Sequence, residues 1–357
     1  MPTVFPAPPL LRRINFMIRL IWMNNFVRVY LFFRRIYRYG YYQHRPTFTL
    51  TVPQPKLPSF WSPSTVDVHL PPSYSSSSSG SKRYPLVLDI HGGGFNIGHP
   101  VLDSQFSRHI SNKADCIVIA LAYRHTPWVQ WPTPVRELTA LVAAILDDPR
   151  IAHMIDSSKV AIGGFSAGGN LATVLSIQPE LRSRIQTIIP VYPVLDFTMT
   201  TAAKIATRPP NSPPDLLRDM GDRFSWGYIP LGTIRENPSL SPLFAEAEDL
   251  PEYAYIVGAE YDMLNIDAKN FYHKFGSGKK NWVYDEVKTV LHGFTHQSVA
   301  RLDPVENKRL DGITFALYDR IAEWLTEKVW GTEGVEGPTP VPDEGTDDQL
   351  GDDIVVL

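Results

Sequence analysis

Two glycine-rich stretches, His91-Gly-Gly-Gly-Phe95 and Gly164-Phe-Ser-Ala-Gly-Gly169, decide the fold predicted for this chain. Each follows a short apolar run rich in β-branched residues, 86–90 before the first and 160–162 before the second. Such runs are typical of buried strands, so each glycine-rich stretch is predicted to be a sharp turn leaving a strand. The small residues around Ser166 predict a tight strand-to-helix turn that exposes the serine hydroxyl.

The first of these stretches presents backbone rather than side chains. Three consecutive glycines follow His91, and because they carry no side chain, their N–H groups are accessible. Backbone donors of this kind can closely approach a negative charge that develops on a reacting oxygen. The two stretches together, in this order and each after a strand, are a far more specific signal than either alone.

The composition is that of a globular protein. Of 357 residues, 43% are apolar and 11% aromatic, which is enough for a large core in one catalytic domain with insertions. The net charge of −3 gives no reason to expect nucleic acid as a partner. The single cysteine, Cys116, excludes an intramolecular disulfide and lies in an apolar run. We therefore expect a buried thiol in a protein that needs no oxidising compartment.

Predicted strands and helices alternate along residues 66–330, the predicted catalytic domain. Alternation of this kind indicates an α/β fold with a mostly parallel central sheet and helices on both faces. The sheet is predicted to begin at Val66, and the serine run at 75–79 is predicted to be a surface loop. The strands are predicted at 66–70, 86–90, 116–122, 159–163, 187–191, 253–257 and 282–287, and the helices at about 101–113, 133–146 and 169–176.

Two further segments depart from this alternation. The region from about 198 to 240 contains two Pro-Pro pairs and a later aromatic group. Because an insertion after a strand can cover the edge where a site lies, we expect this region to form part of a cap. The segment 331–357 holds eight acidic residues and no Lys or Arg. Its Gly, Pro and Thr content predicts a disordered, solvated tail without chemistry.

The N-terminal segment, 1–65, is basic: it holds eight arginines and Lys56, and the first acidic residue is Asp67. On a helical wheel of residues 10–39, the arginines occupy one half and large apolar side chains occupy the other. The longest run without arginine, 20–27, is too short to span a bilayer, and no signal-peptide cleavage site follows. Two interpretations stay open: the apolar half caps a site, or it lies in a membrane interface with arginines at the lipid phosphates. A targeting peptide is disfavoured because residues 10–39 contain no serine.

Three side chains that follow predicted strands have the types needed for nucleophilic catalysis. A serine hydroxyl needs a base, usually a histidine that a carboxylate orients. Ser166 lies in the glycine-rich turn, Asp262 follows the predicted strand 253–257, and His292 follows the last predicted strand. Each lies just past the C-terminal end of a strand, the edge where open α/β sheets place their sites. The sequence therefore predicts a Ser-His-Asp triad at this edge.

Several neighbouring residues are rivals for these roles. Glu260 and Asp267 are alternative acids, but Asp262 has the better position after its strand. His296 lies four residues after the predicted base, a spacing that suits a metal pair, yet no HExxH-like glutamate or third ligand accompanies it. We therefore predict no metal, and the lack of a phosphate-binding glycine motif after a strand predicts no nucleotide cofactor. His91 is expected to shape its loop rather than to act as a second base.

Seven motifs stand in order along residues 60–330. They are HGGGF at 91–95, Tyr123-Arg124 with Pro127, GFSAGGNLA at 164–172, YPVLD at 192–196, NPSLSPL at 237–243, YDML at 261–264 and HGF at 292–294. With these motifs the chain resembles the hormone-sensitive-lipase-like esterase family of the α/β-hydrolases. That family usually has Asp or Thr before the serine, where this chain has Phe165. We expect this side chain to point away from the nucleophile.

The resemblance implies an α/β-hydrolase fold with a helical cap, built from the N-terminal segment and the insertion near 198–240. It also implies the triad predicted above and an oxyanion hole of the backbone N–H groups of Gly93, Gly94 and Ala167. The expected function is hydrolysis of carboxylic esters of small, largely apolar substrates through an acyl-enzyme, without a cofactor. An amidase, thioesterase or lactonase on the same fold, tailoring a small natural product, stays open, as does a non-catalytic binding protein.

The expected partner is a small-molecule ester, with peripheral membrane contact if residues 10–39 lie in an interface. We expect a cytoplasmic protein that is not secreted. The sequence does not indicate an oligomeric state.

Overall fold

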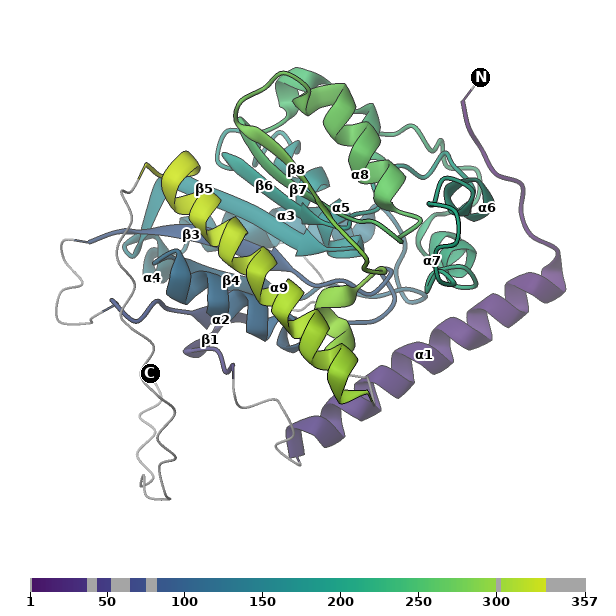
Figure 1. Ribbon diagram of the computed structural model, residues 1–357, viewed down its shortest axis with the longest axis horizontal. Coiled ribbons are helices and arrows are strands. Elements are labelled where there is room, and N and C mark those ends of the chain that lie inside the picture. The colour runs from purple at the N-terminus through teal and green to yellow at the C-terminus, as the bar shows by residue number, and fades with distance from the viewer. Residues whose placement is uncertain (1, 37–43, 53–64, 75–81, 300–302, 332–357) are drawn as a thin grey trace.

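The computed structural model describes residues 2–36, 44–52, 65–74, 82–299 and 303–331. The serine run at 75–79, Lys56 and the acidic segment from residue 332 onward lie outside the described residues, so the expectations for them stay predictions. In the described part, one eight-stranded sheet runs through the centre of the domain with helices on both sides (Figure 1).

The central sheet is mostly parallel, as predicted. Its strands are β1 (Phe48–Thr51), β2 (Thr65–His69), β3 (Tyr84–Ile90), β4 (Ile117–Leu121), β5 (Ile155–Phe165), β6 (Thr187–Val191), β7 (Tyr253–Ala259) and β8 (Trp282–Val287). From edge to edge they follow the order β1-β2-β4-β3-β5-β6-β7-β8. Every pair from β4 to β8 is parallel, whereas β2 is antiparallel to both of its neighbours.

The sheet begins earlier in the chain than predicted. Strand β1 pairs with β2, with Phe48 opposite Val68, so part of the segment 1–65 belongs to the sheet. This strand has only four residues, and most of them are exposed. It therefore lacks the buried apolar run by which the other strands could be predicted.

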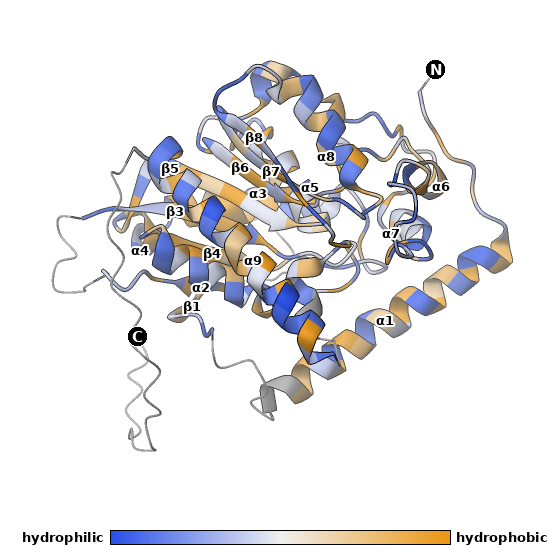
Figure 2. Cartoon of the chain, viewed as in Figure 1, coloured by the Kyte–Doolittle hydropathy of each residue, from blue (hydrophilic) through white to orange (hydrophobic). Residues whose placement is uncertain are grey.

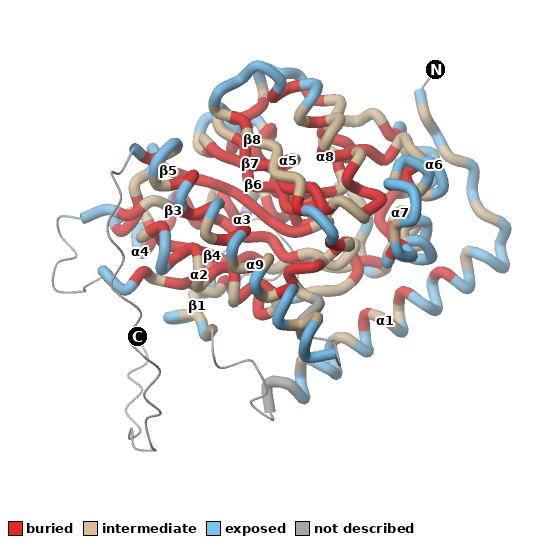
Figure 3. Tube along the Cα trace, in the orientation of Figure 1, coloured by how far each residue is buried: buried red, intermediate tan, exposed pale blue. Residues whose placement is uncertain are grey.

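Helices cover both faces of the sheet. On one face lie α2 (Ser104–Lys113) and α9 (Pro304–Trp324), and on the other lie α3 (Thr133–Asp147), α5 (Ala167–Ser176) and α8 (Asn265–Phe271). Strand residues alternate between these two cores: Leu88 belongs to the α3–α5–α8 side and Val87 to the α2–α9 side. Figure 2 shows apolar residues gathered on the central strands, and Figure 3 shows the same strands buried between the helical layers.

The insertion between β6 and β7 contains two short helices, α6 (Thr201–Ile205) and α7 (Gly221–Tyr228). Helix α6 begins after Thr200, whose hydroxyl accepts a hydrogen bond from the Ala203 N–H at 3.1 Å. Both Pro-Pro pairs lie in the irregular chain between the helices, consistent with the inability of proline to continue a helix. Figure 1 shows α7 next to the long N-terminal helix.

The N-terminal helix, α1 (Leu10–Ile36), runs along the outside of the domain and contacts α7 (Figure 1). Its buried residues are Phe16, Leu20 and Asn24, and on the helical wheel this stripe lies in the half that carries the arginines. The apolar half is exposed instead, with Ile18 61% and Trp22 65% accessible. Most of the apolar half therefore faces away from the domain, and the capping role of this segment stays a prediction.

The length and apolar content of helix α1 bear on whether it could cross a membrane, which the short arginine-free run at 20–27 argued against. Leu10–Phe33 is long and apolar enough by those two measures to cross a bilayer, although arginines interrupt it. A single helix of this kind near an N-terminus also occurs in signal sequences and in soluble cores, so the finding alone does not establish a span. The buried stripe on α1 ties the helix to the domain surface.

Candidate active site

Ser166 lies at the turn between β5 and α5. Its φ of 55° and ψ of −113° are strained for a residue with a side chain. The turn depends on two glycines, because a Cβ on Gly164 would lie 2.4 Å from the Ile90 carbonyl oxygen, and one on Gly168 only 1.9 Å from it. The Ser166 N–H donates to the Val191 carbonyl at 2.9 Å, which fixes the strained residue to β6.

His292 lies between Ser166 and Asp262. Its Nε2 is 2.9 Å from Ser166 Oγ, and its Nδ1 is 2.6 Å from Asp262 Oδ2. The structure thus brings together three side chains that lie after the separate strands β5, β7 and β8. With Nδ1–H donating to the carboxylate, the Nε2 lone pair faces the serine hydroxyl, which is the tautomer that can accept its proton.

The Asp262 turn is fastened to the insertion. Asp262 Oδ1 accepts the Leu264 N–H at 2.9 Å, and Asp215 of the insertion accepts the Met263 N–H at 2.8 Å. Asp215 also pairs with Arg208 at 3.3 Å. Burial raises the pKa of Asp215, and the negative charge of nearby Asp262 raises it further. Sequence reasoning missed Asp215 and Arg208, because no motif surrounds them in the proline-rich insertion.

The three residues predicted to supply oxyanion donors line the same pocket as Ser166. Gly93 has φ 118° and Gly94 has φ 59°, both in the region that favours glycine. A Cβ on Gly93 would lie 2.1 Å from the Ile97 carbonyl oxygen, so the loop is too close-packed for a side chain. Ala167 is the first residue of α5, and its N–H has no acceptor within the helix.

His91 is buried beneath this glycine loop. Its ring stacks on Tyr123 with centroids 4.4 Å apart, and its Nδ1 lies 2.8 Å from the Gly92 carbonyl oxygen. A Cβ on Gly98 would lie 2.3 Å from the same nitrogen, so the loop packs directly on the ring. Burial lowers the pKa of His91 well below its usual range. These contacts are those of a residue that shapes the loop.

The rival acids and the rival histidine have other partners. Glu260 accepts a backbone N–H of the loop after β8 at 2.8 Å. Asp267 is buried and pairs with Lys204 at 2.5 Å, and burial raises the pKa of Asp267 to about 6. His296 Nε2 lies 2.6 Å from Asp103 Oδ1. Among the described residues, none of these contacts the Ser166 hydroxyl, and no group of three or more His, Cys, Asp or Glu is arranged to hold a metal.

Phe165, the residue before the serine, points into the core on the α2–α9 side of the sheet. Its ring meets Phe106 edge-on at a centroid distance of 5.1 Å and His296 at 4.8 Å. The side chain therefore lies away from the serine hydroxyl, as the sequence predicted for this departure from the family pattern.

A pocket of about 610 Å³ opens over Ser166 and His292. The insertion contributes Met220 and Phe224 to its wall, and α1 contributes Phe26 and Tyr30. The wall is mostly apolar, with few polar groups, as in sites that bind an apolar small molecule. Both segments predicted to build a cap thus reach the pocket, α1 through Phe26 at the edge of its apolar half and Tyr30 in its arginine half.

Comparison with known proteins agrees with this geometry. Residues 87–296, more than half of the chain, match a family model described as the alpha/beta hydrolase fold. The chain belongs to the hormone-sensitive-lipase-like esterases of the α/β-hydrolase family. The predicted fold is thereby confirmed, and this esterase is a carboxylic ester hydrolase.

Relatives of the esterase come from distant organisms. An arylesterase from Saccharolobus solfataricus is 30% identical over 214 residues, which are 58% of this chain and 68% of the relative. Carboxylesterase NlhH from Mycobacterium tuberculosis is 25% identical over 59% of this chain and 67% of its own length. Arylacetamide deacetylase from Bos taurus is 27% identical over 57% of this chain and 66% of its own. Among solved structures, an esterase from Pyrobaculum calidifontis matches with a TM-score of 0.68 and 20% identity, covering 91% of this chain and 99% of that one.

Proposed function

We propose that this esterase hydrolyses small, largely apolar carboxylic esters by means of a Ser166–His292–Asp262 triad and a covalent acyl-enzyme. The observation that carries the proposal is the position of His292, whose two ring nitrogens lie 2.9 Å from the serine hydroxyl and 2.6 Å from the carboxylate. A serine in hydrogen-bonding reach of an oriented imidazole is the arrangement that nucleophilic catalysis requires.

In the acylation half-reaction, Ser166 Oγ attacks the ester carbonyl carbon while its proton passes to His292 Nε2. Asp262 accepts the hydrogen bond from Nδ1–H and stabilises the imidazolium that forms. Backbone N–H groups of the glycine loop and of the residue after the serine donate to the developing oxyanion. The intermediate collapses as Nε2 returns its proton to the departing alkoxide oxygen, so an alcohol leaves and the serine is acylated.

Deacylation repeats these steps with water as the nucleophile. His292 Nε2 accepts a proton from water as its oxygen attacks the acyl carbon, and the same backbone donors hold the second oxyanion. Collapse of this intermediate breaks the bond to Ser166 Oγ, which takes the proton back from Nε2. The carboxylic acid product leaves, and the enzyme returns to its starting state.

An amide substrate is the second candidate, because one of the relatives is named an arylacetamide deacetylase. Amide hydrolysis would use the same proton transfers, except that Nε2 would protonate a departing amine instead of an alkoxide. The identity of the leaving group therefore decides between the two, and it can be tested with substrates that share one acyl group.

The proposal predicts that a fluorophosphonate probe labels the wild-type enzyme at Ser166, and that the label is absent from Ser166→Ala. Intact mass and peptide mapping locate the adduct. p-Nitrophenyl esters of increasing chain length, with anilides and thioesters of the same acyl groups, then rank the substrate classes by kcat/KM. We expect the esters to rank first. An unlabelled wild-type enzyme contradicts the acyl-enzyme mechanism and favours a binding protein, and anilides ranking first would make it an amidase.

We further propose that α1 holds this enzyme at the cytoplasmic surface of a membrane, lying flat with its apolar half in the lipid interface. Leu11, Ile18 and Trp22 are exposed on that half. Arg19 and Arg28 are exposed at its two edges, where they would meet anionic lipid phosphates. An exposed apolar surface of this kind marks an interaction site.

Contacts on the other side of α1 support a flat orientation. Asn24 Nδ2 donates to the Asn96 carbonyl oxygen at 2.5 Å, and Leu20 is buried against Gly227 of α7. Phe26 and Tyr30 of the same helix line the pocket over Ser166. The proposed membrane face therefore lies next to the pocket that would receive an apolar ester.

The double variant Ile18→Asp with Trp22→Asp tests this membrane contact. Each large apolar side chain contributes about 1.5–3 kcal/mol when buried, so we expect binding to phosphatidylserine-containing vesicles to fall at least about tenfold. Co-sedimentation at low and high salt measures it, and wild-type binding should weaken with salt. The matched control is Ile234→Asp with Val305→Asp, which adds the same charges at exposed apolar positions outside α1. Equal binding of the two double variants contradicts the membrane contact.

A further inference from the structure

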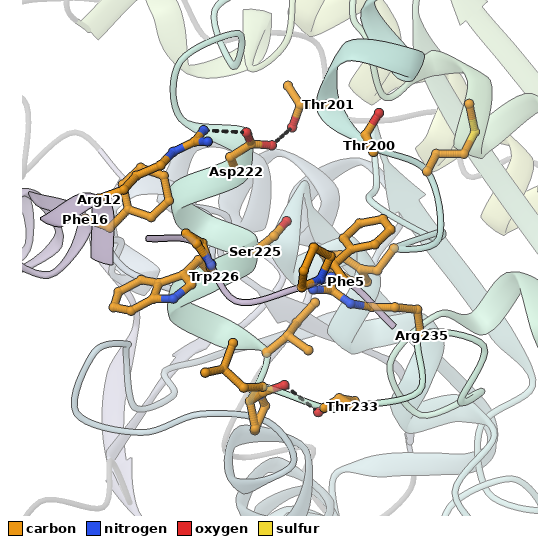
Figure 4. Close-up of a pocket in the computed structure, with 18 of the residues that line it drawn as sticks. Phe5, Arg12, Phe16, Thr200, Thr201, Asp222, Ser225, Trp226, Thr233 and Arg235 are labelled. Atoms are coloured by element: carbon orange, nitrogen blue, oxygen red, sulfur yellow. Dashed lines mark hydrogen bonds and ion pairs between the residues drawn. The ribbon is translucent and has the colours of Figure 1, made fainter. Parts of the chain in front are cut away.

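A second cavity lies beside the active-site pocket, between the N-terminal segment and the insertion (Figure 4). It has a volume of about 350 Å³. Phe5 and Phe16 of the N-terminal segment line it together with Trp226 of α7 and Arg235. None of the steps proposed for ester hydrolysis uses this cavity.

Arg235 places a buried positive charge in this cavity. The residue is only 9% exposed, and its guanidinium lies over the Phe5 ring at 4.6 Å. Within the described part of the chain, no carboxylate or carbonyl oxygen accepts a hydrogen bond from the guanidinium, and Figure 4 shows no dashed line from it. Burial lowers the pKa of Arg235. A guanidinium that burial has partly desolvated and that has no anionic partner is costly, because part of its hydration is lost and no counter-ion replaces it.

The carboxylates close to Arg235 are engaged elsewhere. Glu236 accepts two hydrogen bonds from the Thr3 N–H, at 2.8 and 3.0 Å, and so fastens the N-terminal segment. Asp222 pairs with Arg12 at 3.2 Å and accepts the Thr201 hydroxyl at 2.7 Å. Arg12 and Asp222 compensate each other at the cavity rim. Among the charged residues that line the cavity, Arg235 is therefore the one left uncompensated.

The cavity and the active-site pocket share part of their walls. Phe197, Met199, Thr201 and Ser225 line both. A chain bound over Ser166 would thus need to pass only this layer of side chains to bring its far end into the cavity. Phe197 and Met199 in this layer are apolar, and Thr201 and Ser225 add only short hydroxyl side chains, so the layer contains no charged group that would oppose a methylene chain.

We propose that this cavity is a subsite for a carboxylate at the end of the substrate remote from the ester, and that Arg235 binds it. The inference rests on the proposed function, because the ester end of the same molecule occupies the pocket over Ser166. A planar guanidinium matches a carboxylate with two parallel hydrogen bonds. One uncompensated positive charge suits a monoanion, whereas a phosphate dianion would leave a negative charge buried near Asp222.

Two homologous series of substrates test the subsite. The first carries the carboxylate on the acyl side, as p-nitrophenyl hemiesters of dicarboxylic acids with increasing numbers of methylenes. The second carries it on the alcohol side, as butyrate esters of ω-hydroxy acids. Each member is paired with a neutral partner in which the far carboxylate is a methyl ester. The quantity measured is the ratio of kcat/KM for the anionic substrate to that of its neutral partner.

We expect this ratio to peak at one chain length in the wild-type enzyme. Arg235→Gln should lower the peak about ten- to a hundredfold, the worth of hydrogen bonds to a charged group. Arg235→Lys keeps the charge without the planar fork and should give an intermediate ratio. Arg218→Gln, which makes the same charge change on the exposed surface of the insertion, should keep the wild-type peak.

Calorimetry measures how tightly the same pairs of ligands bind to Ser166→Ala. This experiment tests the subsite without turnover. A peak in the affinity ratio that disappears in Arg235→Gln supports the subsite even if no ester is hydrolysed, in which case only the proposed function has failed. If Arg235→Gln changes neither the kcat/KM ratio nor the affinity ratio more than Arg218→Gln does, the subsite is overturned. The proposal of ester hydrolysis is unaffected by that result. If Arg235→Gln does not fold, a wild-type ratio in Arg235→Lys at every chain length overturns the subsite as well.

Discussion

Ser166→Ala is expected to lower kcat for a p-nitrophenyl ester by about 10⁶, and His292→Ala by a similar factor, with little change in substrate binding. Ser166 provides the oxygen that is acylated, and His292 provides the base 2.9 Å away that takes its proton. Since each is useless without the other, the double variant should lose no more than either single variant. Burst and steady-state kinetics measure the change in kcat and the change in substrate binding.

The residual rate is informative as well. Backbone N–H groups at Gly93, Gly94 and Ala167 remain in place when the serine is removed, so a rate about 10³-fold above water should persist. Ser158→Ala is the matched control, because Ser158 lies on the same strand β5 but is exposed near its opposite end. Retention of more than a small fraction of activity in Ser166→Ala would assign the nucleophile elsewhere.

The strand ends that carry these residues could be predicted from sequence because they are set locally. Buried strands need continuous apolar runs, which the sequence displays. The strained turn at Ser166 needs glycine at 164 and 168, and the sequence displays these as well. Parallel strands bring their C-terminal ends to one edge, so three separate positions could be placed together from the sequence alone. The short edge strand β1 has mostly exposed residues and carries no such signal.

Contacts between distant segments could not be predicted in the same way. Asp215 reaches the Asp262 turn across 48 positions, through an insertion whose path no local pattern encodes. The helical wheel of α1 separated arginines from apolar residues but could not show which half faces the domain. The structure buries Phe16, Leu20 and Asn24 within the arginine half, because these residues fit against α7 and the glycine loop.

The second large effect is expected from Asp262→Asn, which should lower kcat on the order of 10⁴. Asp262 Oδ2 accepts the hydrogen bond of His292 Nδ1–H at 2.6 Å, whereas an asparagine can place its NH₂ group there instead. That exchange favours the imidazole tautomer with its proton on Nε2. The nitrogen facing Ser166 would then be a donor, and it could not accept the serine proton.

Three neighbouring variants separate this effect from a general loss of structure. Glu260→Gln should stay close to wild type, because the partners of Glu260 are a backbone N–H and the exposed Lys288 rather than the imidazole. Asp215→Asn alters a group that holds the Met263 N–H rather than the imidazole, so it should reduce kcat far less than Asp262→Asn. Asp267→Asn removes the partner of buried Lys204 and should act mainly on thermal stability. An inactive Glu260→Gln beside a near-wild-type Asp262→Asn would transfer the role of the acid to Glu260, even though the imidazole lies against Asp262.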